Sequence, residues 1–272
     1  MAFVRDRPVL AFVGLTMAVS WGLWWPIAGG RLDPEPFGTL ATFGPTIAGL
    51  AVTARLHGLT GLARLGRRLV SWRVRPRWYL FSLGFGPAIL LVAVGIHRAL
   101  GGAPVVTSLP SPTILVVGFG YVLVTSVAGE ELGWRGFALP RLQRSYSALT
   151  ASLLVGAVWF GWHLPLFFTP GDFHRFVPLP LFALQIVGFS VLYTWLFNHT
   201  DGSLVLPHLF HTASNFGFFV IPVLPTGPGG PTRPLWIGIG LLWLVVAIVI
   251  AVAGHEDLSR AGSSVTYDEF ER

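Results

Sequence analysis

Residues 234–253 read PLWIGIGLLWLVVAIVIAVA, a run in which no side chain carries a charge. The hydrocarbon core of a bilayer is about 30 Å thick, and a helix needs about 20 mostly apolar residues to cross it. This stretch has that length and composition. It therefore predicts a transmembrane helix and an α-helical membrane protein.

The composition of the whole chain supports this class. Of its 272 residues, 53% are hydrophobic and 11% are charged, whereas soluble domains carry roughly 25% charged residues. We predict an all-α polytopic membrane protein with about eight transmembrane helices and a polar intramembrane catalytic cavity. The eight apolar segments lie near 8–29, 37–56, 78–99, 113–139, 148–168, 179–198, 203–221 and 234–253.

The chain reads as one transmembrane domain over residues 1–254. Pro- and Gly-rich stretches read as short connections and not as domain linkers, and no internal repeat is found. The tail, residues 255–272, is polar with little to bury, so we predict a disordered cytoplasmic tail. Cysteine is absent, which excludes disulfides, thiolate catalysis and cysteine metal sites.

The placement of arginine predicts the orientation. All 18 basic residues are arginine and the net charge is +6. With the N-terminus inside, fourteen arginines fall on the inner side and only Arg31, Arg98, Arg175 and Arg233 on the outer side. Cytoplasmic loops carry such an excess, so both termini are expected in the cytoplasm of a cell-membrane protein. We attribute the positive charge to these loops and to lipid contact, and we expect no nucleic-acid partner.

Two adjacent acids interrupt the fourth apolar segment, where residues 127–137 read VAGEELGWRGF. A charge at the centre of a membrane helix costs about 2.5–3.5 kcal/mol unless it is paired or faces a polar cavity. On a helix Glu131 and Arg135 lie one turn apart, whereas Glu130 points about 140° away from Arg135. We predict that Glu131 is the structural partner of Arg135 and that Glu130 is free to act on a water. Alternatively, both acids are solvated near the cytoplasmic interface.

Further polar residues fall in two later segments. His163 follows the aromatic run at Trp159, and the segment 203–221 carries His208, His211 and Asn215 on one stripe. Taken singly, such residues are usually satisfied by backbone or interhelical hydrogen bonds. Together with a free glutamate, they are the groups needed to activate water and to stabilise an oxyanion.

Nucleophilic catalysis fits the sequence less well. There is no Gly-x-Ser-x-Gly elbow, and neither Ser126 nor Ser214 has a base that the sequence can assign. The His-Glu-x-x-His pattern of soluble zinc proteases is also absent.

Three short motifs occur in order on separate predicted helices and resemble those of the CAAX protease and bacteriocin-processing (CPBP, or Abi) family. This is the family of the Ras-converting CAAX endopeptidase. The resemblance covers about 130–215 directly, within a core of about 113–221. The motifs are Glu130-Glu131-x-x-x-Arg135, Trp159-x-x-x-His163 and His211-x-x-x-Asn215.

The resemblance implies an intramembrane endopeptidase that acts on a membrane-anchored protein or peptide. It implies that Glu130 activates water, helped by His163, and that His211 and Asn215 stabilise the oxyanion. Glu131 and Arg135 match the remaining motif positions. The family usually has Phe where this chain has Trp159, and His208 lies outside the pattern.

Several alternatives stay open. Glu130, His163 and His211 could hold a zinc ion with an open water position, although we favour a metal-independent site because no i,i+4 histidine pair flanks a glutamate. The chain could also be a catalytically silent scaffold or immunity-type protein, or a transporter subunit, which would be expected to show repeated halves. The sequence does not name the substrate; its Arg-, Gly- and Ala-rich composition hints at a GC-rich bacterial genome.

The predicted depths of the site residues disagree. At 1.5 Å per residue, Glu130 lies about 13 Å and His211 about 12 Å from the cytoplasmic ends of their segments, but His163 lies about 24 Å from Ser147. Either the fifth helix starts later than residue 148, or it extends into the cytoplasm before it enters the bilayer.

Overall fold

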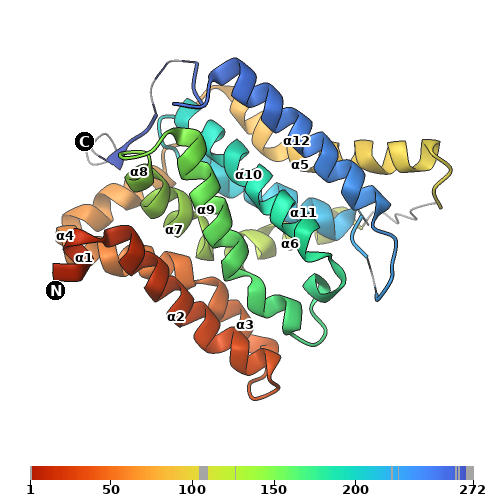
Figure 1. Cartoon of the computed structure of the whole chain (residues 1–272), viewed down its shortest axis with the longest axis horizontal. Helices are drawn as coiled ribbons and strands as arrows, with labels where there is room; N and C mark the ends of the chain where they lie inside the picture. The colour runs from red at the N-terminus through yellow and green to blue at the C-terminus, as the bar shows by residue number, and fades with distance from the viewer. Residues whose placement is uncertain are drawn as a thin grey trace.

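The computed structural model describes residues 2–103, 110–125, 127–221, 223–225, 227–260, 262 and 264–267. The described residues form helices and no strand, so the predicted all-α class is confirmed (Figure 1). The longer helices are α2 (Pro8–Ala28), α4 (Gly44–Leu69), α5 (Pro76–Ala99), α6 (Pro112–Thr125), α9 (Ala148–Trp162), α10 (Leu179–His199), α11 (Val205–Val220) and α12 (Arg233–Ala253). The shorter elements are α1 (Ala2–Asp6), α3 (Pro34–Thr42), α7 (Glu131–Gly133), α8 (Leu139–Leu142), the 3₁₀ turns η1 (Val127–Gly129), η3 (Leu164–Phe168) and η4 (Phe173–Phe176), and the π-helix η2 (Trp134–Ala138).

Five helical stretches of the described chain are long and apolar enough to cross a membrane: Pro8–Ala28, Pro76–Ala99, Ala148–Phe168, Leu179–His199 and Arg233–Ala253. A sixth arises if α3 and α4, which meet at a 46° bend, count as one span. The chain is therefore a multi-pass membrane protein. The two remaining predicted segments, near 113–139 and 203–221, contain helices too short to pass the same test, so the predicted count of eight is not reached on length and composition.

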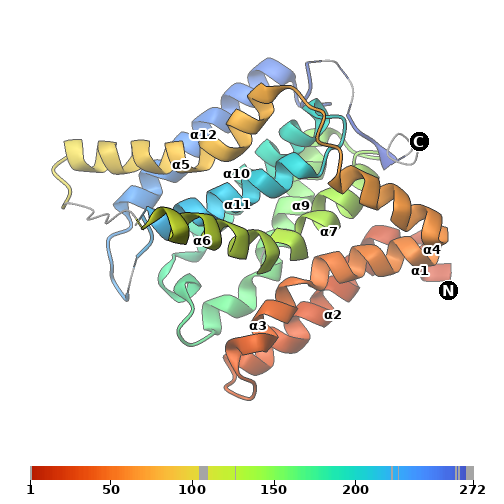
Figure 2. The same ribbon diagram turned by 180° about the vertical axis from the view of Figure 1, so that it is seen from behind.

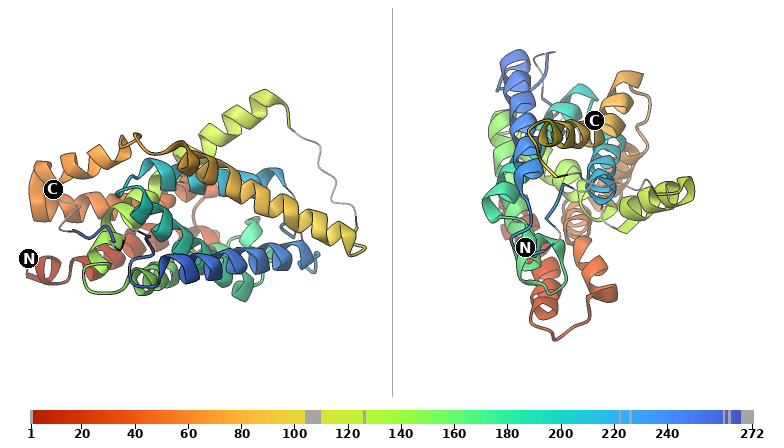
Figure 3. Two further views of the ribbon diagram at one scale, coloured as in Figure 1. Left: turned by 90° about the horizontal axis from the view of Figure 1, so that it is seen from above. Right: turned by 90° about the vertical axis from the view of Figure 1, so that its right-hand side faces the viewer.

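The helices form one bundle. α2 packs against α3 and α4 on one side, and α9 and α10 run through the middle (Figure 1). α10 also contacts α12, and α5 packs along both α11 and α12, as the reverse view shows (Figure 2). α6 has no buried residue and stands out from the bundle (Figure 3). Its main contacts are with α11 and η1.

The fourth segment is a chain of short elements and not the single helix that we predicted. α6 ends at Thr125, and Glu130 has φ −114° and ψ −57° just before α7. The five residues of η2 then follow a π-helical path. Pro140 lies next in α8 and has no N–H for the carbonyl four residues earlier, which interrupts the regular ladder. Short π-helical bulges often occur at functional sites.

This segment is held against α4 by a close approach of two backbones. A Cβ on Gly133 would lie 2.3 Å from the carbonyl oxygen of Pro45, and one on Gly49 would lie 3.3 Å from Cα of Gly133. Only glycine at position 133 permits this contact. The crossing fixes the backbone directly between Glu131 and Arg135.

We expect Gly133→Ala to destabilise the protein, because the added methyl group must push α7 away from α4. Overpacking of this kind costs typically 1–3 kcal/mol, by an order-of-magnitude estimate. The melting midpoint in detergent should fall. Gly14→Ala in α2 is the control, since nothing lies within 4 Å of the new Cβ; a similar fall in that variant would show that the α4–α7 contact is not responsible.

The described part of the C-terminal tail is packed against the bundle. Leu258 is fully buried, and the Gln143 amide donates to the carbonyl oxygen of Val265 at 2.8 Å. Asn198 donates to the carbonyl oxygen of Asp257 at 2.7 Å. Composition alone predicted disorder for residues 255–272. These contacts hold the described tail residues because two buried amides pair with its backbone.

Candidate active site

Glu131 is the centre of a buried polar cluster. Its Oε1 accepts a hydrogen bond from Arg135 Nη1 at 2.8 Å and another from His211 Nδ1 at 2.8 Å. Both Glu131 and Arg135 are 0% exposed. The i,i+4 pair expected from the spacing is therefore present, and the link to His211 on α11 is an addition that the sequence did not predict.

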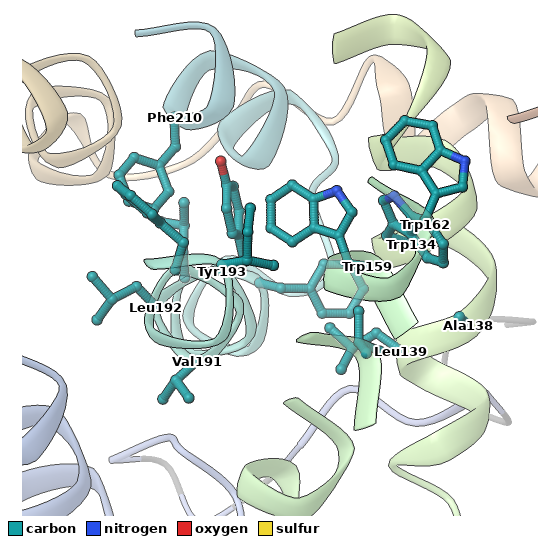
Figure 4. Close-up of a cluster of buried hydrophobic side chains, with 14 of the residues drawn as sticks. Trp134, Ala138, Leu139, Trp159, Trp162, Val191, Leu192, Tyr193 and Phe210 are labelled. Atoms are coloured by element: carbon teal, nitrogen blue, oxygen red, sulfur yellow. The ribbon is translucent and has the colours of Figure 1, made fainter. Parts of the chain in front are cut away.

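Two aromatic rings cover the Arg135 guanidinium. Its central carbon lies 3.9 Å from the ring centroid of Tyr193 and 4.5 Å from that of Trp159. Figure 4 shows these two rings side by side among the buried side chains. A desolvated cation over aromatic faces gains about 2 kcal/mol or more. Tyr193, on α10, is a further site residue that sequence reasoning missed.

Glu130 has different partners from its neighbour. Its Oε2 accepts a hydrogen bond from the indole Nε1 of Trp159 at 2.7 Å, and its side chain lines the main cavity. The residue is 3% exposed. Trp159 stands where the family motif usually has Phe. Its indole thus acts as a hydrogen-bond donor to the candidate base, Glu130.

The two motif histidines both use Nδ1 for a local contact. His163 caps the end of α9, and its Nδ1 lies 2.8 Å from the carbonyl oxygen of Trp159. His211 Nδ1 faces the Glu131 carboxylate. Since a carbonyl or carboxylate oxygen only accepts, Nδ1 is the donor in both rings. The Nε2 atoms are left for other contacts.

One cavity of about 640 Å³ brings the candidate residues of three segments together. Glu130, His163, His211 and Asn215 all line it. Apolar and aromatic side chains form much of the remaining wall. The cavity also has polar wall residues that sequence reasoning missed, namely Glu35, Asp172, His174 and Tyr193.

The other polar residues considered in the sequence, His208 and the two serines, differ in whether they line the cavity. His208 Nδ1 lies 2.6 Å from the carbonyl oxygen of Leu204, an ordinary bond within one turn, and His208 does not line the cavity. Ser214 does line it, packed close to Gly86 of α5. Ser126 lies outside the described residues.

The residues present do not make a ready metal site. Within the described parts of the chain, no group of three or more His, Asp or Glu side chains is placed to hold a metal ion. Glu130, His163 and His211 share the cavity wall without forming such a group.

The structure excludes one of the two explanations for the predicted depth of His163. Ser147 Oγ accepts from the backbone N–H of Thr150 at 3.2 Å and caps α9 at Ala148. The explanation that the fifth helix starts later is therefore wrong. His163 nevertheless reaches the same cavity as Glu130.

Two comparisons with known proteins bear on this site. Residues 111–217 match the family described as Type II CAAX prenyl endopeptidase Rce1-like. A protein of Methanococcus maripaludis named CAAX prenyl protease 2 is 28% identical over 192 residues, which cover 67% of each chain. The region matched by the family contains all motif residues from Glu130 to Asn215. The resemblance found in the sequence is thereby confirmed.

Proposed function

We propose that this chain, which is similar to the CAAX protease and bacteriocin-processing family, is an intramembrane endopeptidase that uses a water activated by Glu130. One observation carries the proposal. Two adjacent buried carboxylates have separate partners: Glu131 is paired with Arg135 and His211, whereas Glu130 faces the cavity with one indole donor. The free carboxylate is the one available to take a proton.

In the proposed reaction, Glu130 takes a proton from a cavity water, helped by His163, while the water oxygen attacks the peptide carbonyl. Asn215 and His211 stabilise the oxyanion that forms. Because Glu131 holds the Nδ1 hydrogen of His211, this ring donates through Nε2 only as an imidazolium. The Glu131 carboxylate then balances its charge. Glu131 and Arg135 act by positioning His211 and not by contact with substrate.

The test is direct cleavage by the purified chain in liposomes. The archaeal relative is named a CAAX prenyl protease, so the first substrates are prenylated peptides with a CAAX end, beside unprenylated and unrelated membrane peptides. Mass spectrometry in ¹⁸O water should show one ¹⁸O in the new carboxyl group. A folded protein that cleaves none of these peptides would favour the silent scaffold or immunity-type role.

We propose that the reaction is independent of metal, because the sequence lacks the His-Glu-x-x-His spacing and the site residues do not form a ready ligand group. The purified protein should hold less than stoichiometric zinc and should keep its activity in a strong chelator. Activity that disappears with a stoichiometric zinc ion and returns when zinc is added would reverse this proposal.

We also propose that both termini lie in the cytoplasm. Hydrogen bonds from Leu204 to Arg68 and from Ser203 to Ser71 join two loops that the arginine pattern places inside. Reporter fusions at 60–75, 145 and 200 should therefore read cytoplasmic, and fusions at 104, 172 and 228 external. An external reading at 145 together with a cytoplasmic one at 172 would reverse the assignment.

A further inference from the structure

A carboxylate–imidazole pair lies on the cavity wall outside the three motifs. Asp172 begins the turn η4, and its Oδ1 accepts from the backbone N–H of His174 at 3.0 Å and from the ring Nδ1 of His174 at 2.6 Å. Capping a turn requires only the first bond. The second bond fixes the tautomer and the orientation of a buried imidazole, which is 6% exposed.

The His174 ring lies beside His163. Their ring centroids are 5.6 Å apart, with 36° between the ring planes. Phe182 of α10 contacts both rings, with centroids 5.0 Å from His174 and 5.1 Å from His163. Phe167 of η3 lies 5.4 Å from His174. The two imidazoles are thus adjacent within an aromatic wall of the cavity.

The hydrogen bonds give the two rings the same tautomer, with the hydrogen on Nδ1. His163 donates its Nδ1 hydrogen to Trp159, and His174 donates its own to Asp172. Each neutral ring keeps a lone pair on Nε2. Two groups that can carry charge contact the His174 ring: Asp172 on its own turn and His163 at the end of α9. The His174 ring therefore lies between the negative charge of Asp172 and the ring of His163.

Resting on the endopeptidase function proposed above, we propose that Asp172 and His174 form a positioning pair that orients His163 and balances its charge while it carries a proton. One proton leaves the attacking water as its oxygen bonds to the carbonyl carbon. The C–N bond then breaks, its electron pair stays on nitrogen, and the nitrogen takes one proton. His163 shares the proton between these two steps, and Asp172 compensates the charge through His174.

The experiment combines deletion, a double variant and chemical rescue. Loss of the carboxylate partner of a metal-bound histidine lowers activity by about 10- to 100-fold, and we expect a loss of the same order in kcat for His174→Ala, with little change in KM. Asp172→Asn should lower kcat, and the double variant should be no worse than His174→Ala because Asp172 acts through His174. Added imidazoles should restore His174→Ala in the order of their basicity, since the lost ring lines an open cavity.

The matched control is His199→Ala, which removes another helix-end imidazole bonded to a backbone carbonyl, at 2.9 Å from Trp195, but away from the cavity. It should leave kcat unchanged and respond to no imidazole. Normal kcat in His174→Ala, additive losses in the double variant, or rescue that ignores basicity would overturn the inference. Failure of the endopeptidase proposal is seen separately, as an unaltered protein that is folded but cleaves none of the test peptides.

Discussion

Glu130→Gln should leave the fold intact and lower the rate of peptide cleavage by about 10² to 10⁴, the factor typical of losing general acid–base catalysis. Glutamine has the size of glutamate, and its amide oxygen still accepts the Trp159 indole hydrogen that Glu130 accepts at 2.7 Å. What the variant loses is a group able to take a proton from water. KM should change little, because the loss affects the chemical step.

The measurement is kcat beside the melting midpoint in detergent. Glu35→Gln is the matched control, since Glu35 is a second carboxylate on the cavity wall and has its own hydroxyl partner in Thr39. This control should cleave at close to the normal rate. If Glu130→Gln retains normal turnover, or melts as early as Glu131→Ala, then Glu130 is not the base.

The spacing of residues that are close in the sequence predicted the apolar segments and one ion pair of the candidate site. The positions of the apolar segments follow from length and composition, and the pair of Glu131 with Arg135 follows from one helical turn. Both depend on residues that are close in the sequence. The break before Glu131 was missed because apolar residues flank the two acids on both sides and no proline within 113–139 marks it.

Contacts between segments could not be predicted in this way. Glu130 meets Trp159 across 29 positions and Glu131 meets His211 across 80. The sequence marked Trp159 as a departure from the usual Phe, but only the packing of α9 against the motif shows that its indole donates to Glu130. The Asp172–His174 pair lies in a short connection between apolar segments, where its Asp-x-His spacing was its single local signal.

Glu131→Ala should lower both stability and activity, in contrast to the change at Glu130. The substitution leaves the guanidinium of Arg135 buried without its carboxylate partner, and breaking a buried ion pair in this way costs about 3–5 kcal/mol. Arg135→Ala should be similarly destabilising, since it strands the carboxylate and removes the cation from the faces of Tyr193 and Trp159. Both variants should melt early in detergent.

The double variant, Glu131→Ala with Arg135→Ala, separates the two roles of Glu131. It should recover part of the stability that either single variant loses, because neither charge is then left alone. It should not recover activity, because His211 has lost the carboxylate on its Nδ1 that orients the ring and balances an imidazolium. Melting midpoints and kcat for the three variants test this together. Stability losses that simply add would show that the two charges are not coupled, and a double variant with restored turnover would show that His211 works without Glu131.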